Sequence, residues 1–273
     1  MTRNQLRKFT VGLVVVIGLS LFTAVTWADS DVNFKQLAND RAGGLVTVKY
    51  ILAVSMGGAR GNMEQESEIE MTCVMATAEG MVMCSNNQLT GFVEMIKQFA
   101  GAAGREISAV PKDIRIIAGP ESKSFDAEIV ARDSELDIAW IKIKNADDIQ
   151  FDHIDFKAGK AADIGDEFVI LRRMGNHFGR AIVISEGKIG GITSKPRTLY
   201  IPAAAYSLGG GLPVFTPSGD VIGLMISQLP DSDGNSPQMM VMIGGNLQDA
   251  VSGLILPAEE VVRATARAMT PRL

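Results

Sequence analysis

The stretch ARDSELDIAWIKI, residues 131–143, carries a pattern that recurs along most of the chain. Asp137 stands directly before Ile138–Ile143, a short run of the kind that forms a buried β-strand. An acid at this place either caps local backbone groups or has a chemical role. Similar runs, separated by turn residues, occur at 45–51, 114–118, 127–131, 167–171, 181–184, 221–227 and 239–243. Roughly ten to twelve short strands of irregular spacing predict an all-β chain built from barrels or sandwiches.

The first 28 residues have the features of an export signal. A basic start and an apolar run over residues 11–25 come before the small residue Ala28, which a polar, acidic segment follows. An uncleaved membrane anchor is the alternative, because residues 9–27 are long enough to span a bilayer. We therefore predict a signal peptide, or an N-terminal membrane anchor, at 1–28. The protein is expected to be periplasmic or secreted, and tethered to the membrane by residues 9–27 if the segment is retained.

The remaining 245 residues are enough for one large all-β domain or for two small barrels that share a core. They hold 23 basic and 31 acidic residues, a net charge of −8. An acidic surface repels the phosphates of nucleic acid, so no nucleic-acid partner is expected. The charge neither excludes nor demonstrates a basic protein partner.

The two cysteines, Cys73 and Cys84, are predicted to form a disulfide. An exported chain meets oxidising conditions, and the segment between the cysteines has the pattern of a strand, a turn and a second strand. A tight turn at Ala78-Glu79 places the two cysteines opposite each other in an antiparallel pair, which is close enough for a disulfide. Two buried free thiols are the alternative.

Two segments have helical patterns. Apolar residues at 92, 95, 96 and 99 share one helical face, and Gly101 and Gly104 follow them. The second segment begins at Pro257, has acids in its first turn and ends with arginines, which suits the helix dipole.

Four stretches, in matching order and spacing, resemble the HtrA/Deg family of trypsin-like serine proteases. The first is the stretch 131–143, in which the family's triad aspartate opens a strand. The others are GDEFVI at 165–170 followed by GNHFG at 175–179, SGDVIGL at 218–224, and GLILPAEE at 253–260. The resemblance covers about residues 45–268.

The resemblance implies an all-β fold of two packed six-stranded antiparallel β-barrels, trypsin/chymotrypsin-like, with a C-terminal helix. Any active site would lie in the cleft between the barrels. The expected organisation is a lead-in at 29–44, an N-terminal barrel at 45–150 with a helical insertion at 91–104, a C-terminal barrel at 151–256, and a C-terminal helix and tail at 257–273. Since the sequence ends at Leu273, we expect no peptide-binding domain after this helix.

The resemblance also places the catalytic triad, in which a hydroxyl attacks, an imidazole takes its proton and a carboxylate holds the imidazole. Asp137 matches the family aspartate. The family's Thr-Asn-x-His-Val corresponds to SNNQL at 85–89, which puts Gln88 in the place of the histidine. A gap-free count from Gly80 selects Asn87 instead. Neither amide can accept a proton at neutral pH, so the base is absent.

The nucleophile is absent as well. The family's Gly-Asn-Ser-Gly-Gly corresponds to part of SLGGGLPVF at 207–215, and Gly210 takes the serine position. Leu208, Gly209 and Gly211 are then the remnant of the oxyanion loop. Ser207 lies three residues upstream, and recruiting it needs a shift of about 10 Å.

For the remaining residues that could have a catalytic or metal-binding role, we expect a structural position only. His153 and His177 are expected in a connection and a turn, and only a rearranged site would use them. The alternate acids of Asp231–Asn235 lack the remaining ligands of a calcium loop, so a surface loop is expected there. We predict no metal site and no cofactor.

The sequence therefore predicts an exported pseudoprotease of trypsin-like fold that binds a protein or an extended peptide, or serves as a scaffold. An active serine endopeptidase of the HtrA/Deg type with a non-standard site is the alternative, and a membrane-tethered structural partner is a third. A membrane contact is expected only if residues 1–28 are retained.

Overall fold

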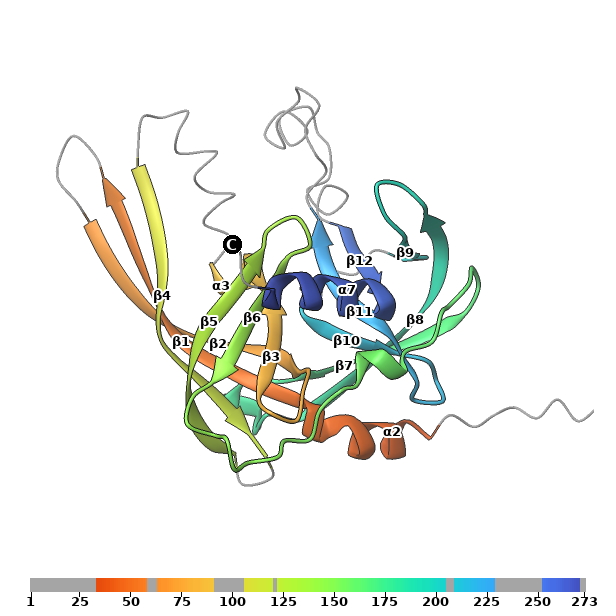
Figure 1. Cartoon of the computed structure of the whole chain (residues 1–273), viewed down its shortest axis with the longest axis horizontal. Helices are drawn as coiled ribbons and strands as arrows, with labels where there is room; N and C mark the ends of the chain where they lie inside the picture. The colour runs from red at the N-terminus through yellow and green to blue at the C-terminus, as the bar shows by residue number, and fades with distance from the viewer. Residues whose placement is uncertain are drawn as a thin grey trace, which may run out of the picture. The chain divides into compact units, whose positions relative to one another are not determined.

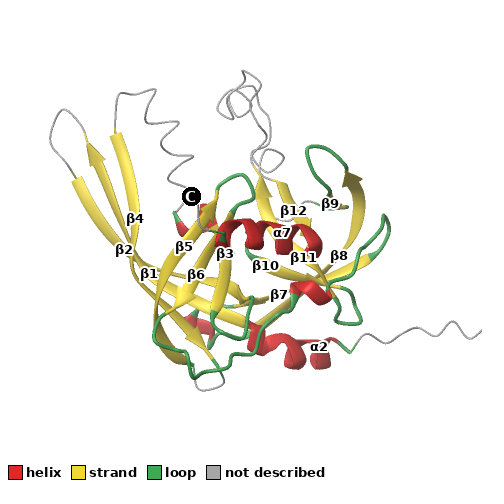
Figure 2. Ribbon diagram, in the orientation of Figure 1, coloured by secondary structure: helices red, strands yellow, loops and turns green. Residues whose placement is uncertain are grey.

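The computed structural model describes residues 33–57, 63–90, 106–119, 122–204, 209–228 and 252–270. Strands dominate these segments and form two closed six-stranded antiparallel barrels, followed by a C-terminal helix (Figures 1 and 2). The predicted fold class is thereby confirmed. The predicted export signal, the helical insertion at 91–104 and the strand at 239–243 lie outside the described residues. Among the described residues, no helix is long and apolar enough to cross a membrane.

In the first barrel, neighbouring strands follow the order β1-β2-β3-β6-β5-β4. These strands are β1 (Leu45–Gly57), β2 (Met63–Met75), β3 (Met81–Ser85), β4 (Glu106–Ala118), β5 (Lys123–Asp133) and β6 (Ile138–Ile143). Helix α2 (Phe34–Arg41) and the 3₁₀ turn η1 (Ala42–Gly44) precede them, and the short helix α3 (Asn86–Leu89) follows β3.

In the second barrel, the order is β10-β11-β12-β9-β8-β7. The strands are β7 (Glu167–Arg173), β8 (Ile182–Thr193), β9 (Leu199–Pro202), β10 (Leu212–Phe215), β11 (Val221–Gln228) and β12 (Ser252–Pro257). The 3₁₀ turn η2 (Phe156–Ala158) precedes β7, η3 (Asn176–Phe178) joins β7 to β8, and α7 (Ala258–Met269) follows β12. The domain limits proposed from the sequence stay predictions.

The predicted disulfide is present. Cys73 on β2 is bonded to Cys84 on β3, and their Cα atoms are 4.8 Å apart. The register between the two strands is the predicted one, because Val74 lies opposite Met83 and Met75 opposite Val82. The crosslink therefore joins two neighbouring strands of the first barrel directly before α3 begins.

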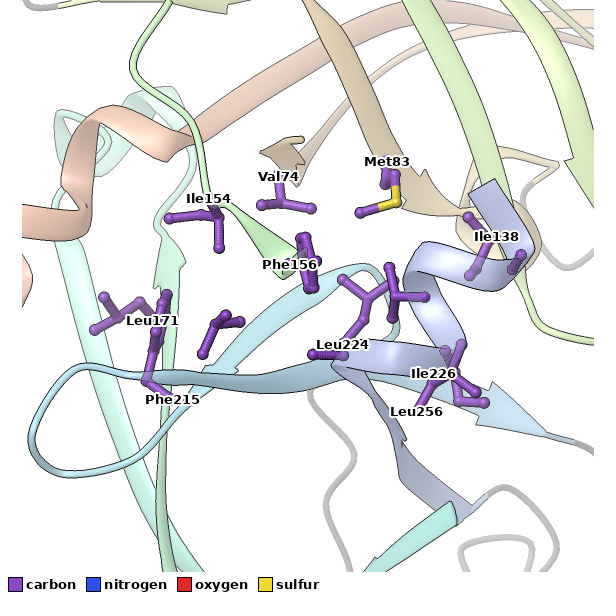
Figure 3. Close-up of a cluster of buried hydrophobic side chains, with 14 of the residues drawn as sticks. Val74, Met83, Ile138, Ile154, Phe156, Leu171, Phe215, Leu224, Ile226 and Leu256 are labelled. Carbon is purple, nitrogen blue, oxygen red and sulfur yellow. The ribbon is translucent and has the colours of Figure 1, made fainter. Parts of the chain in front are cut away.

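The two barrels share one hydrophobic core (Figure 3). Val74 and Met83 enter it from the first barrel, and Phe215 and Leu224 enter it from the second. Each of these four side chains is at most 1% exposed. Separate apolar clusters fill the inside of each barrel. Since burial of apolar area is the main favourable term in folding, this shared core holds the barrels together and fixes the residues that lie beside it.

Helix α7 covers part of this core. Val261 and Ala264 are buried on its inner face, and Glu259 and Glu260 occupy its first turn. The indole N–H of Trp140 on β6 donates to Thr265 Oγ1 at 3.1 Å, which ties the helix to the first barrel. The acids near the helix N-terminus and Arg267 in the last turn agree with the dipole argument made from the sequence.

Polar contacts also join the barrels. Thr72 on β2 and Arg173 on β7 exchange two hydrogen bonds, at 3.0 and 3.1 Å. The Arg173 guanidinium donates to the carbonyl oxygens of Leu45 at 2.8 Å and Ala42 at 2.6 Å. Because the donor is a cation and much of it is buried, these bonds are stronger than neutral ones and hold β7 against the start of β1.

Candidate functional site

The candidate site begins where β3 turns into α3. Ser85 is the N-cap residue of this helix, and its Oγ accepts a hydrogen bond from the Gln88 backbone N–H at 3.1 Å. Ser-x-x-Gln is a capping-box pattern, so the sequence favours a helix start at this point. The Tyr50 hydroxyl donates to the Gln88 carbonyl at 2.8 Å, and burial raises the pKa of Tyr50 to about 12. The backbone at Gln88 is therefore fixed from both sides.

Asp137 lies beside Ser85 at the start of β6 and is 1% exposed. Its Oδ1 accepts from the Asn87 backbone N–H at 2.7 Å, and its Oδ2 accepts from the Ser227 backbone N–H at 3.0 Å. The Ser85 hydroxyl donates to the same carboxylate at 2.9 and 3.0 Å. The carboxylate thus joins β3, α3 and β6 of the first barrel to β11 of the second.

The environment of Asp137 disfavours its charge. Burial raises the pKa of Asp137 from its usual 3.8 to about 6, although the hydrogen bonds from Asn87, Ser227 and Ser85 act in the opposite direction. The backbone of Asp137 has a φ of 55°, in the left-handed region that few residues other than glycine adopt. The chain keeps an acid in a strained and desolvated position, which is typical of sites whose geometry once had, or still has, a function.

The segment Gly209–Gly211 packs directly against these residues. A Cβ atom added to Gly210 would collide with Asp137 Oδ2 and would lie 3.2 Å from Ser85 Cβ. A Cβ at Gly211 would lie 2.5 Å from the Ser85 backbone nitrogen, and the φ of Gly211 is 81°. Only glycine fits this close approach between the two barrels.

The structure brings together most of the residues selected from the sequence. Asn87 and Gln88 both lie beside the Gly209–Gly211 segment: Asn87 Nδ2 donates to the Ser227 carbonyl at 3.5 Å, and Gln88 Nε2 would meet a side chain at Gly209. Leu208 and Ser207 lie outside the described residues. Asn87, Gln88 and Gly209 are half-buried.

Neither of the two histidines is a partner of Asp137. His153 Nδ1 is 3.3 Å from the Phe151 carbonyl oxygen, and its electrostatic neighbour is Glu79. The ring of His177 packs against Phe178 with centroids 5.0 Å apart. Both imidazoles are exposed, and neither is placed to take a proton from a hydroxyl beside Asp137.

Two members of the site were not expected from the sequence. The family resemblance assigns no role to Ser85, although its capping pattern with Gln88 marks it as the start of a helix. Ser227 takes part through its backbone N–H, and no side-chain pattern reveals that role. Within the described residues, no group of three His, Cys, Asp or Glu side chains is arranged to hold a metal ion.

A family model for the trypsin-like peptidase domain matches residues 72–224, more than half of the chain. The chain belongs to the trypsin-like peptidase domain family. The matched residues include Gln88, Asp137 and Gly210.

The chain is also similar to a "Probable periplasmic serine endoprotease DegP-like" of Rhizobium meliloti (strain 1021), with 28% identity over 141 residues. This similarity covers 50% of the chain and 27% of the relative, so the chain matches about a quarter of that protein's length. A solved structure of a serine-to-alanine variant of the HtrA-type protease AlgW with a decapeptide superposes with a TM-score of 0.55 at 17% identity, over 86% of this chain and 67% of that one. These findings agree with the HtrA-type fold expected from the four stretches.

Proposed function

We propose that this protein is an exported pseudoprotease that keeps the trypsin-like fold and binds an extended peptide or an unfolded protein without cutting it. Gln88, with Asn87 as the alternative, stands at the position of the base, Asp137 at that of the triad aspartate, and Gly210 at that of the nucleophile. The observation that carries the proposal is the closed set of contacts around Asp137. Its carboxylate is engaged by Ser85, Asn87 and Ser227, where a triad aspartate would hold an imidazole.

The chemistry that remains is too weak for proteolysis. Among the described residues, the hydroxyl bonded to Asp137 belongs to Ser85, which is 0% exposed, out of reach of a peptide, and has no imidazole beside it. Loss of one triad member leaves only about 10³–10⁴-fold acceleration over water, and further losses add little because the triad acts as a unit. A site that lacks both base and nucleophile is therefore expected to bind rather than to cleave.

Binding has its own support. Asn87, Gln88 and Gly209 are half-buried where the two barrels meet, and the first two carry side-chain amides. The main chain of an extended peptide can form hydrogen bonds with such amides, which requires no catalytic residue. The solved HtrA-type protease that shares the fold is described with a decapeptide, and a peptide ligand is proposed here by analogy with it.

Export is part of the proposal. The Cys73–Cys84 disulfide is typical of proteins that fold in an oxidising compartment. The similarity to a protein described as periplasmic points to the same compartment. A mature N-terminus at Asp29 would support cleavage of the predicted signal.

The experiment is a titration of the purified protein with fluorescently labelled unfolded casein, read by anisotropy, with the casein analysed afterwards by mass spectrometry. We expect saturable binding and intact casein. Gln88→Trp, which places bulk beside Gly209, should weaken binding by about tenfold or more, corresponding to about 1.4 kcal/mol. Gln150→Trp, the same change at an exposed position, is the matched control. Cleaved casein, or equal binding by both variants, would contradict the proposal.

A further inference from the structure

A second candidate site lies away from Asp137, in a groove between the end of β5 and the last turns of α7. The groove has a volume of about 700 Å³, and residues from β5, β6 and α7 line it. Helix α7 lies across this part of the first barrel (Figure 1).

A β-bulge and small side chains create the groove. The pairing between β5 and β6 shifts register between Ile129 and Ala131, so Val130 is the extra residue of a bulge. Bulges re-aim the side chains that follow them. Ala131 packs at this point against the shared core, and Ala264 and Ala268 face it from the helix. Because all three are alanines, the helix and the strand leave space between them.

Part of the groove wall is apolar. Val130 is 43% exposed and Met269 is 40% exposed, and both are among the large hydrophobic side chains that the described residues leave open to water. Trp140 closes the bottom, and its only polar atom already donates to Thr265. A ligand therefore meets exposed apolar side chains at Val130 and Met269 and polar side chains elsewhere in the groove.

The rim carries positive charge. Arg132 and Arg267 line the groove and are exposed, and neither guanidinium has an ion-pair or hydrogen-bond partner in the described part of the chain. The one acid in the lining is Asp133, whose Oδ1 accepts from the Leu136 backbone N–H at 2.9 Å. Two free cations on a chain of net charge −5 favour a ligand that carries carboxylates.

Within the described residues, the part of β5 that lines the groove is paired on one side only. Strand β4 pairs with β5 only over Lys123–Asp126, and beyond Asp126 the described residues supply no strand partner on that side, while β6 occupies the other. An extended peptide can form main-chain hydrogen bonds with such an edge.

We propose that this groove binds an extended protein segment that carries both apolar side chains and carboxylates. The apolar side chains pack between Val130 and Met269, and the carboxylates pair with Arg132 and Arg267. The inference is independent of the proposed function, because none of Asn87, Gln88 and Gly209 lines the groove. It holds whether or not the chain cleaves peptides.

Trp140 permits a direct test, because Trp27 is the only other tryptophan. In a full-length chain with Trp27→Phe, Trp140 emission reports on the groove. The probe is a capped hexapeptide of alternating leucine and glutamate, which has no fluorescence of its own. We expect a saturable change in emission. The double variant Arg132→Glu/Arg267→Glu should weaken binding by about tenfold or more, since two attractive pairs become repulsive.

The matched control is Lys35→Glu/Lys157→Glu, which makes the same change of charge at two exposed cations outside the groove. This control should bind the peptide like the parent chain. Four outcomes would overturn the proposal: no saturable change up to about 1 mM peptide, equal weakening in both double variants, equal binding of a leucine-lysine hexapeptide, or displacement of the peptide by inorganic phosphate alone. The last would reveal a small-anion site.

Discussion

The shared core and the site around Asp137 are adjacent in the fold, since Ile138 and Ile226 belong to the core and their chain neighbours Asp137 and Ser227 belong to the site. The core contains the apolar side chains that a two-barrel protease fold needs. In the proposed function, the site keeps the backbone of such a fold without the base and the nucleophile. Packing depends on volume and apolarity, whereas triad chemistry depends on one imidazole and one hydroxyl. The same packing can therefore support a site with or without the triad.

The largest expected change in stability comes from truncating a side chain of the shared core. Phe215 is 0% exposed in the shared cluster, and Phe215→Ala should lower the free energy of unfolding by about 3–5 kcal/mol through lost burial and a residual cavity. Urea denaturation followed by circular dichroism measures this effect. Phe178→Ala removes the same ring at a position that is 60% exposed, and it should change stability by less than about 0.5 kcal/mol. Similar losses in the two variants would mean that the shared core is not what joins the barrels.

The second effect concerns the charge at Asp137. Since its native pKa of about 6 lies above the usual 3.8, the folded state binds the proton more tightly than the unfolded state. The resulting stability is fully present below about pH 4 and is lost as pH rises through 6, by an amount on the order of 3 kcal/mol.

Asp137→Asn cannot titrate, so its stability should lack this component. The difference in unfolding free energy between the parent chain and Asp137→Asn, measured in urea at each pH, cancels the other titrating groups. As pH rises from about 4 to 7, the unfolding free energy of the parent chain should fall relative to that of Asp137→Asn. A difference that stays constant, or moves the other way, would refute the assigned environment of Asp137.

The third prediction concerns the stability and activity of a variant in the Gly209–Gly211 segment. Gly210→Ser restores the residue type of an active protease but brings a Cβ atom onto Asp137 Oδ2, and overpacking of this kind costs about 1–3 kcal/mol. Gly175→Ser is the control, because a Cβ at Gly175 meets nothing within 4 Å. We expect loss of stability in the first variant only, and no casein cleavage by either. An active Gly210→Ser variant would show that a base is present after all.

The smallest effect concerns the polar contacts between the barrels. Glu70 on β2 accepts from Arg180 Nη2 at 3.0 Å and from the Asn176 backbone N–H at 3.3 Å, both from the second barrel. Glu70→Gln should cost about 1 kcal/mol in unfolding free energy, because the pair is half-buried and also bonded to backbone. The exposed pair of Glu68 and Lys49 lies within the first barrel, so Glu68→Gln should cost less than about 0.5 kcal/mol. The reverse order would exclude the inter-barrel role of Glu70.

Much of the fold could be read from the sequence because its signals are local. The alternation and turn residues around Ala78-Glu79 set a register that pairs Cys73 with Cys84, and the structure has this register. The acids and arginines of α7 likewise predict both ends of the helix. Local rules succeed where the partners of a residue lie within a few positions of it.

The contacts of the site could not be predicted where the two partners are far apart in the sequence or where one partner is a backbone group. The Asp137 carboxylate binds Ser85, 52 residues earlier, and the Ser227 N–H, 90 residues later. The sequence located Asp137, Gln88 and Gly210 through their resemblance to a known family, but it contained no sign that the hydroxyl of Ser85 contacts this carboxylate. The bulge at Val130, which opens the β5–α7 groove, was also unreadable, because any residue type can occupy it.

The most direct test of the central claim is labelling of the purified protein with a fluorophosphonate probe, followed by mass spectrometry of every serine-containing peptide. A serine acts as a nucleophile toward this probe only when a base activates it. The account predicts no labelled serine in the folded protein, under conditions in which trypsin is labelled completely. A labelled serine whose replacement by alanine also abolishes cleavage of unfolded casein would contradict it.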